Sequence, residues 1–277
     1  MKFKYISLFA LLIGILSCEE TESPIPEEVA LPELTSGTAD FSNYVAVGAS
    51  FTAGFTDGAL FKASQENSFP NILSQQFAKV SGTTFTQPLM NDNIGGLLIG
   101  GIPNNNFLPR LFFNGAGPAR LPATPTTEGT ANLGGTFNNM GVPGAKSFHL
   151  LFDGYGNPAN LQLGLANPYF VRMASSPTAT VLGDAMAQNP SFFTLSEVGG
   201  NDVLGFATSG GDGSNPITDS ATFDASFNAL VNTLTSNGAK GVVTNVPYVT
   251  DLPFFTTVPN NALVLDAATA GQLTGVF

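Results

Sequence analysis

The strongest indication of the fold of this chain is the stretch Tyr44-Val45-Ala46-Val47-Gly48-Ala49-Ser50. It begins with a short run of β-prone and small apolar residues, which Gly48 stops, and it continues as a loop of small residues to Gly54. Apolar runs of this length that do not alternate with polar residues are typical of strands covered on both faces, as in parallel sheets. The stretch therefore predicts a buried strand that delivers Ser50 to a loop at its carboxyl end.

Helical and strand patterns alternate along the rest of the chain. Ser68 is a good N-cap and Pro70 suits an early helical position, so a helix is predicted to begin there. Its apolar face is expected to contain Phe69, Ile72, Leu73, Phe77 and Val80. The other predicted elements are a helix over 178–188, a strand over 191–195, a helix over 223–234 and a buried strand over 241–247. This alternation predicts an α/β fold of three layers, in which a parallel sheet is covered by helices on both faces.

The composition allows a large buried core and argues against several functions. Of the 277 residues 43% are hydrophobic, whereas chains that stay disordered are poor in apolar residues. Nine basic against 20 acidic residues, a net charge of −11, offer no basic stripe for a phosphate backbone, so no nucleic-acid partner is expected. One His and one Cys cannot assemble the ligand sets that zinc sites need, and a lone Cys makes no internal disulfide. A metal site would have to consist of carboxylates alone, and we expect neither a metal nor a cofactor.

Residues 1–18 are predicted to be a targeting signal and not part of the folded domain. Lys2 and Lys4 precede an apolar run from Ile6 to Leu16, as in a secretory signal. This run is too short to cross a bilayer, which needs about 20 residues. It leads into Ser17-Cys18, which resembles the end of a bacterial lipoprotein signal and implies lipidation of Cys18 and a membrane anchor. The alternative is a buried cysteine in an ordinary signal.

The next segment, residues 19–40, is predicted to be an extended tether. Seven acidic residues and no basic residue lie between Cys18 and Phe41, together with several prolines. Such a self-repelling, proline-rich segment favours an extended chain. Acidic residues directly after the cysteine also resemble the surface-export signal of Bacteroidetes lipoproteins. This resemblance implies an outer-membrane lipoprotein of the cell envelope that is exposed at the cell surface.

Residues 41–277 are predicted to form one domain with a loop-rich insertion at about 82–137. The insertion is rich in Gly, Asn, Pro and Thr and shows no sustained periodicity. Long connections of this kind are usually either functional or disordered. The insertion is therefore interpreted as a segment that shapes a binding cleft or as a disordered excursion.

Three glycine-containing loops follow predicted strands or lie between them. They are Gly48-Ala49-Ser50, Asn139-Met140-Gly141-Val142-Pro143-Gly144-Ala145 and Gly199-Gly200-Asn201-Asp202. Ligands of parallel sheets bind beyond the carboxyl ends of the strands, so these loops are the candidate site. The first loop lacks the second glycine of the G-x-S-x-G elbow, which argues against an ordinary α/β-hydrolase. It also does not spell G-x-G-x-x-G, which argues against a dinucleotide site.

The order of these loops resembles the SGNH, or GDSL, hydrolase family, with its block I serine, its block II glycine and its G-x-N-D block III. The resemblance runs from about Tyr44 to the end of the chain, and it implies a flavodoxin-like sheet and an ester hydrolase without a cofactor. By position it implies that Ser50 is the nucleophile. It also implies that the N–H groups of Ser50 and Gly141 and the Asn201 amide bind the oxyanion, and that Asp202 stabilises its loop. The plainer interpretations are a tight turn at Gly141 and a capping side chain at Asn201.

The sequence departs from the family pattern at two points. Ala49 replaces the aspartate that gives GDSL its second letter, which raises a question about the rigidity of the loop. The D-x-x-H block that supplies the general base and its orienting aspartate is absent, so the general base is unknown. The only histidine, His149, is expected to be a helix-surface or locally bonded residue and not a relocated base. A fragment, with the family's last strand and helix missing, is the simplest interpretation.

The leading prediction is a lipid-anchored SGNH-type ester hydrolase that is weak or inactive as this chain. Its substrate would be an ester such as a lipid ester, an acylated glycan or an aryl ester. The rival hypothesis is a non-catalytic surface lipoprotein that keeps the fold and binds a glycan or another ligand. A third hypothesis is a structural protein of the cell envelope.

Overall fold

The computed structural model describes residues 33–258 and 264–275. The predicted signal with Cys18 and most of the predicted tether therefore lie outside the described residues. Contacts divide the chain after Leu34, and the helices and strands belong to the unit that begins at Thr35. No helix within the described ranges is both long enough and apolar enough to cross a membrane.

The helices and strands follow one another from the first strand after the tether to a helix near the end of the chain. In chain order they are β1 (Tyr44–Gly48), α2 (Ser50–Ala53), α3 (Lys62–Glu66), α4 (Phe69–Ser81), β2 (Leu98–Ile99), β3 (Ile102–Pro103), β4 (Leu111–Phe113), β5 (Pro118–Arg120), β6 (Asn139–Gly141), η1 (Ser147–Leu151), η2 (Pro158–Asn160), α5 (Pro168–Val171), α6 (Val181–Met186), β7 (Phe192–Ser196), α7 (Gly200–Thr208), α8 (Ser220–Thr235), β8 (Lys240–Val243), η3 (Val249–Asp251), α9 (Pro253–Thr256) and α10 (Ala267–Thr274).

The main sheet has four parallel strands in the order β6-β1-β7-β8. The first strand along the chain is therefore an inner strand, and the connection from β6 to β7 crosses to its other side. In open α/β sheets a ligand crevice lies where the connections diverge in this way, at the carboxyl ends of β1 and β7. The predicted α/β fold with a parallel sheet is confirmed.

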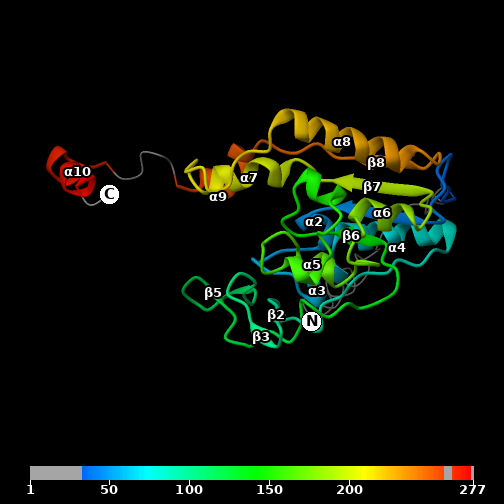
Figure 1. Cartoon of the computed structure of the whole chain (residues 1–277), viewed down its shortest axis with the longest axis horizontal. Helices are drawn as coiled ribbons and strands as arrows, with labels where there is room; N and C mark the ends of the chain where they lie inside the picture. The colour runs from blue at the N-terminus through cyan, green and yellow to red at the C-terminus, as the bar shows by residue number, and fades with distance from the viewer. Residues whose placement is uncertain (1–32, 259–263, 276–277) are drawn as a thin grey trace, which may run out of the picture. The chain divides into compact units, whose positions relative to one another are not determined.

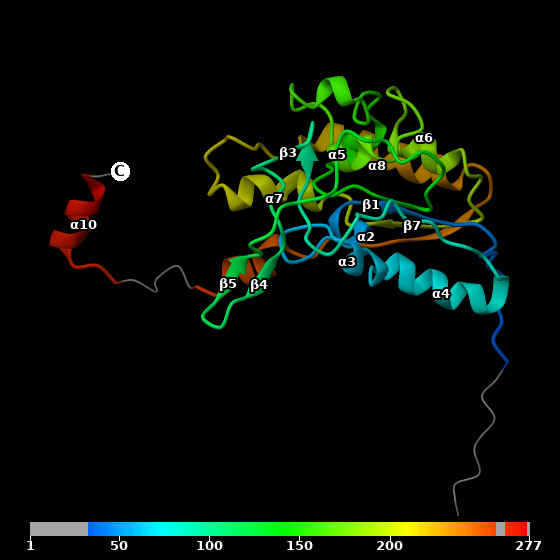
Figure 2. The same cartoon turned by 90° about the horizontal axis from the view of Figure 1, so that it is seen from below.

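Helices cover both faces of this sheet. Val45 and Val47 of β1 point into the larger core, which includes Leu230 and Leu234 of α8 and residues of α6. Tyr44 and Ala46 point to the opposite face, where they pack with residues of α4. Figure 2 shows α6 and α8 on one side of the strands and α4 on the other. Alternate residues of one strand are thus buried on opposite faces, which explains why the strand is apolar throughout.

Aromatic rings anchor α4 against the sheet. The Phe77 ring stacks on Phe41 with 4.0 Å between ring centroids and meets the edge of Tyr44 at 5.1 Å. The helix begins after Ser68 as predicted, with proline in its first turn. Its predicted apolar face is wrong at Ile72, which is 47% exposed, because the helix contacts the aromatic cluster through Leu73 and Phe77 instead.

The strand β8 also differs from its prediction. A buried strand over 241–247 was expected, but the strand is Lys240–Val243 and all four residues are exposed. Val242 and Val243 are 51% and 41% exposed. The reason is the position of β8 at the edge of the sheet, where no other strand within the described ranges pairs with it.

The loop-rich segment 82–137 contains two short antiparallel hairpins, β2–β3 and β4–β5. Met90 and Leu97 of this segment are buried in a small second core with Ala53 and Leu60. The buried Arg172 adds hydrogen bonds to the carbonyl groups of Pro88 at 3.2 Å and of Leu89 at 2.7 Å. The segment is thereby attached to the chain that follows β1 (Figure 1).

Candidate active site

Ser50 lies at the first turn after β1, where α2 begins. It is half-buried, and neither its hydroxyl nor its backbone N–H has a hydrogen-bond partner among the residues that the structure describes. Ala49, which separates it from the strand, has the unusual backbone angles φ −115° and ψ −125°. Ser50 is therefore presented at the carboxyl end of the strand, as the sequence predicts.

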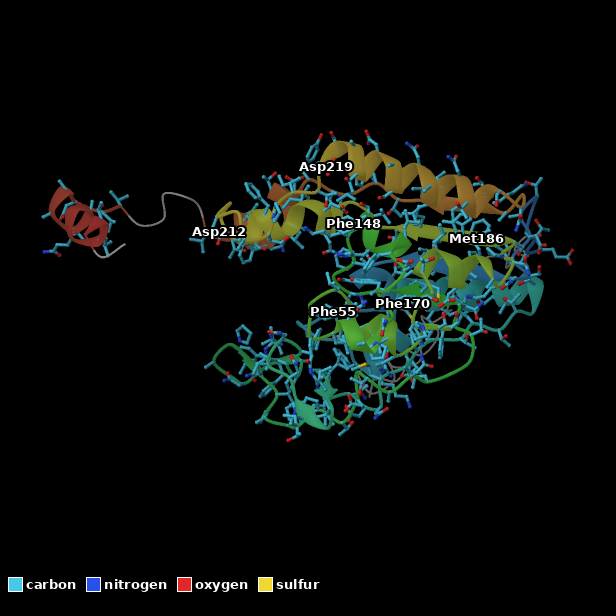
Figure 3. All side chains as sticks on the ribbon, viewed as in Figure 1. Phe55, Phe148, Phe170, Met186, Asp212 and Asp219 are labelled. Atoms are coloured by element: carbon cyan, nitrogen blue, oxygen red, sulfur yellow. The ribbon has the colours of Figure 1, made fainter. Side chains whose placement is uncertain are left out.

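Two pockets meet at Ser50. The first, here called the apolar pocket, has a volume of about 280 Å³, and its walls include Phe51, Phe55, Asn201, Leu204, Val249 and Leu252. The second, called the loop pocket, has a volume of about 260 Å³ and is walled by Phe55, Asn106, Phe107, Leu108, Pro143 and Gly144. Phe55, labelled in Figure 3, lines both. A substrate bound at Ser50 can therefore extend into either pocket.

The carboxylate of Glu197 organises the backbone around Ser50. One oxygen, Oε1, accepts the N–H of Ala49 at 2.7 Å and that of Thr52 at 3.1 Å. The other oxygen accepts the N–H of Phe51 at 2.8 Å. The N–H groups of the residues before and after Ser50 thus donate to Glu197, whereas the N–H of Ser50 itself does not.

The position of Glu197 is electrostatically and sterically unusual. Burial raises the pKa of its carboxyl group, and the hydrogen bonds from the backbone N–H groups oppose this effect. Its φ of 56° lies in the left-handed region, which non-glycine residues rarely adopt. Such outliers often occur at functional sites. Sequence reasoning missed Glu197, although a carboxylate directly after a buried apolar strand was a usable signal.

Asn201 and Asp202 of α7 fix the loop that follows β6. Asn201 Nδ2 donates to the carbonyl oxygen of Ala145 at 2.9 Å. The buried Asp202 carboxylate accepts the N–H of Ser147 at 2.9 Å and its hydroxyl at 2.7 Å. Asn201 also lines the apolar pocket with Ser50, so the structure brings these two predicted site residues together. An amide has two N–H donors, and only one of them is used for Ala145.

Gly141, another predicted site residue, lies outside the two pockets at Ser50. It is the last residue of β6, and its N–H donates to Asn139 Oδ1 at 3.0 Å. A Cβ at this position would lie 2.3 Å from the Ala53 nitrogen, so α2 packs directly on it. Gly141 lines neither pocket that contains Ser50. Its place in the structure is that of a residue whose small size lets α2 approach the sheet.

Gly144 is the glycine of the same loop that reaches Ser50. It is exposed, lines the loop pocket and has φ 80°. Its N–H has no acceptor within the described part of the chain. The signal was present in the sequence, because Gly144 is the second glycine of the string that contains Gly141, and only the strand end at Gly141 distinguishes them.

His149 is packed within its own loop. Its Nδ1 accepts the N–H of Lys146 at 3.1 Å, and its ring stacks on Tyr155 with 4.6 Å between centroids. Burial and the charge of Lys146 lower the pKa of the imidazole to about 4, against an opposing effect of Asp202. His149 lines neither pocket at Ser50. The imidazole is neutral at pH 7, with its proton on Nε2.

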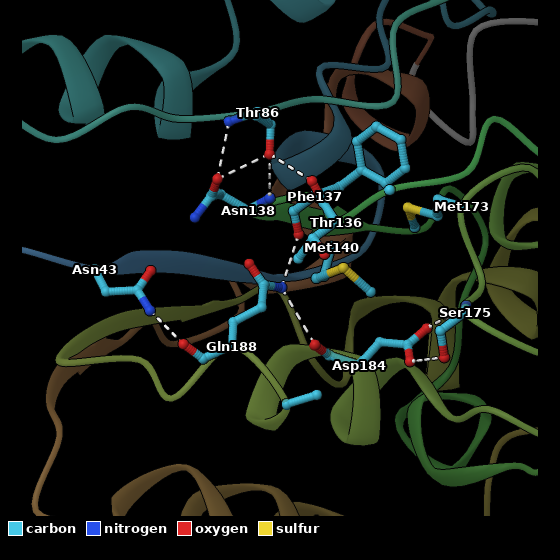
Figure 4. A pocket seen from close by; sticks show the side chains of 12 residues that line it. Asn43, Thr86, Thr136, Phe137, Asn138, Met140, Met173, Ser175, Asp184 and Gln188 are labelled. Atoms are coloured by element: carbon cyan, nitrogen blue, oxygen red, sulfur yellow. Dashed lines mark hydrogen bonds between the residues drawn. The ribbon is translucent and has the colours of Figure 1, made fainter.

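A third pocket, of about 470 Å³, lies at the opposite end of the strands (Figure 4). Its polar groups bind one another. Gln188 Nε2 donates to the carbonyl oxygens of Phe137 at 2.9 Å and Asp184 at 3.2 Å, and Asn138 Oδ1 accepts the N–H and the hydroxyl of Thr86, each at 2.9 Å. The candidate active site is the pair of pockets at Ser50, because Ser50 lines both of them and Asn201 lines one.

In comparisons with known proteins, no family model, no curated protein and no solved structure matches this chain. In residues 33–258 and 264–275 no three His, Cys, Asp or Glu side chains gather as a group that could bind a metal ion.

The packing of α2 on Gly141 makes a testable prediction. Gly141→Ala should lower the free energy of unfolding by about 1–3 kcal/mol or more, because the added methyl group meets backbone atoms that cannot rotate away. Gly117→Ala is the matched control, since nothing lies within 4 Å of a Cβ there, and its effect should stay within about 0.5 kcal/mol. Urea unfolding measures both. Equal losses of unfolding free energy in the two variants would contradict the close packing of α2 on Gly141.

The environment of His149 predicts a pH dependence. The unfolded chain binds a proton at this residue near pH 6.5, whereas the folded protein binds it only near about pH 4. The stability contributed by the neutral imidazole is therefore complete above pH 6.5 and is lost as the pH falls toward 4. Proton NMR can follow this ring without ambiguity, because it is the only histidine. Titration of the folded protein near pH 6.5 would contradict the buried, stacked position.

Proposed function

We propose that this protein is a serine ester hydrolase of the SGNH type that acts on lipid esters or acylated glycans. The observation that carries the proposal is the state of Ser50, whose hydroxyl and N–H have no partner among the described residues, while Glu197 accepts the N–H groups on either side. Asn201 in the same pocket and Gly144 in the adjoining one add further donors. An oxyanion requires several such donors around one oxygen position.

The proposed reaction is acyl transfer to Ser50 and then to water. The Ser50 oxygen attacks the carbonyl carbon of the ester and gives its proton to a base. The negative oxygen that results accepts hydrogen bonds from the N–H groups of Ser50 and Gly144 and from Asn201 Nδ2. The alcohol leaves with a proton, and water then releases the acid from Ser50. The base is not assigned among the described residues.

Ser50 and Asn201 provide the first test of this function. The wild-type chain should form a covalent adduct with a fluorophosphonate at Ser50, detected by peptide mass mapping, and Ser50→Ala should form none. On p-nitrophenyl acetate, Asn201→Ala should lower kcat by roughly 10²–10³, the usual effect of losing one oxyanion donor. Asn228→Ala, an exposed asparagine on α8, is the matched control and should leave kcat unchanged.

Two results would contradict the hydrolase proposal. One is an adduct that forms at other residues but not at Ser50. The other is turnover of several esters by the protein in its full native length that is no faster than turnover by its Ser50→Ala variant. Either result would favour the rival hypothesis of a non-catalytic protein that binds a glycan or another ligand at the same pockets.

We also propose that the protein is an outer-membrane lipoprotein anchored through Cys18 and exposed at the cell surface. The support is in the sequence, namely the charged and apolar segments before Cys18 and the acidic residues after it. Cys18→Ala should move the expressed protein from the membrane fraction to the soluble fraction, because the acyl chains would be lost. Cys18→Ser tests the same point with a smaller change. Unchanged partition of both variants would exclude this anchor.

A further inference from the structure

We propose that Glu197 is a positioning residue for the Ser50 nucleophile, in that its carboxylate fixes the α2 turn so that the Ser50 N–H is left for the reaction. This inference rests on the proposed ester hydrolase function. Ala49 has no polar side chain to bind the turn from within. Among the described residues, Glu197 is the side chain that accepts the N–H groups of Ala49, Phe51 and Thr52.

The geometry selects one N–H and leaves it unused. Both carboxylate oxygens are occupied, and their donors lie one residue before Ser50, one residue after it and two residues after it. A turn held at these three points has little freedom to rotate the remaining peptide group. Ser50, which lines both pockets, therefore keeps its N–H and its hydroxyl without a partner among the described residues.

Glu197 is itself fixed at the end of β7. Ser196, the residue before it, pairs with Gly48, so the base of the Glu197 side chain lies level with the end of β1. The N–H of Glu197 donates to Thr244 Oγ1 at 3.1 Å, which connects it to the segment after β8. This bond accompanies the left-handed φ of 56°. The carboxylate is thus held from one strand and directed across to the turn after its neighbour.

The expected effect is on kcat rather than on KM. An N–H that binds the developing oxyanion interacts more strongly in the transition state than in the bound substrate. Displacement of a reacting group by about 1 Å can cost 10²-fold in rate. In Glu197→Gln one of the two carboxylate oxygens becomes an NH₂ group, which cannot accept a hydrogen bond. If that oxygen is Oε2, the N–H of Phe51 loses its acceptor; if it is Oε1, the N–H groups of Ala49 and Thr52 lose theirs. The turn then loses at least one of its three contacts.

The test compares Glu197→Gln with a matched carboxylate elsewhere. Asp184 also accepts a backbone N–H, that of Ser175 at 2.9 Å, and it lies at the other end of the strands, so Asp184→Asn is the control. On p-nitrophenyl acetate, Glu197→Gln in the full chain should lower kcat about 10²-fold with KM within about twofold, whereas Asp184→Asn should leave both unchanged. Thr244→Val, which removes the acceptor for the Glu197 N–H, should lower kcat by an intermediate factor.

Hydrogen exchange of the backbone amides supplies a readout that does not depend on turnover. In Glu197→Gln the amides of Ala49, Phe51 and Thr52 should exchange faster than in the wild type, while amides of β1 should not change. Unchanged exchange at these three positions, or an unchanged kcat, would overturn the proposal. A loss of about 10⁴ in kcat with unchanged exchange and loss of the acid limb of the pH profile would instead make Glu197 the general base.

Failure of the proposed function gives a different pattern. If the wild type and Ser50→Ala are equally slow on every ester and neither binds the fluorophosphonate, the hydrolase proposal fails. Exchange at Ala49, Phe51 and Thr52 then decides alone whether Glu197 orders the turn. The two failures are therefore distinguishable.

Discussion

The parallel pairing of β1 with β6 and β7 is the constraint on which the candidate site depends. It places Gly48 level with Gly141 on one side and with Ser196 on the other. Three chain segments that are distant in the sequence consequently leave the sheet at the same edge. A shift of one residue in either pairing would turn the side chains of the shifted strand to the opposite face and separate these segments.

The polar groups at this edge bind one another in a defined pattern. Glu197 binds the turn after β1, and Asn201 and Asp202 bind the loop after β6. Segments that follow β7 therefore hold the other two loops. Burial of the Glu197 carboxylate without hydrogen bonds would be costly, but three backbone N–H groups donate to it. The arrangement leaves the donors of Ser50 and Gly144 unused in the described part of the chain.

Much of the fold could be predicted from the sequence because the strands and helices carry strong local patterns. The apolar run at β1 and the apolar face of α8 were recognised from periodicity and length alone. The exposure of β8 could not be predicted, because a short valine-containing strand has the same sequence pattern in the middle of a sheet and at its edge. The exposure of Ile72 could not be predicted either, since the direction of a helix face depends on where its neighbours lie.

The candidate site could be predicted only in part. Motif order is sufficient to bring Ser50 and Asn201 to one pocket, as the structure does. The choice between Gly141 and Gly144 depends on the residue at which β6 ends, and strand ends are the least certain feature of a sequence prediction. The position of Glu197 directly after a buried apolar strand could mark it as a candidate, but its hydrogen bonds to the turn after β1 depend on contacts across two strands. In both cases tertiary geometry supplied what spacing did not.

The central claim is that Ser50 is a nucleophile whose oxyanion donors are already in place. A crystal structure of the covalent phosphonate adduct tests it most directly. We expect a phosphonyl oxygen about 3 Å from the backbone nitrogens of Ser50 and Gly144 and from Asn201 Nδ2, with the Glu197 contacts unchanged. A phosphonyl oxygen directed to solvent, or a turn that must rebuild to accept the adduct, would contradict it.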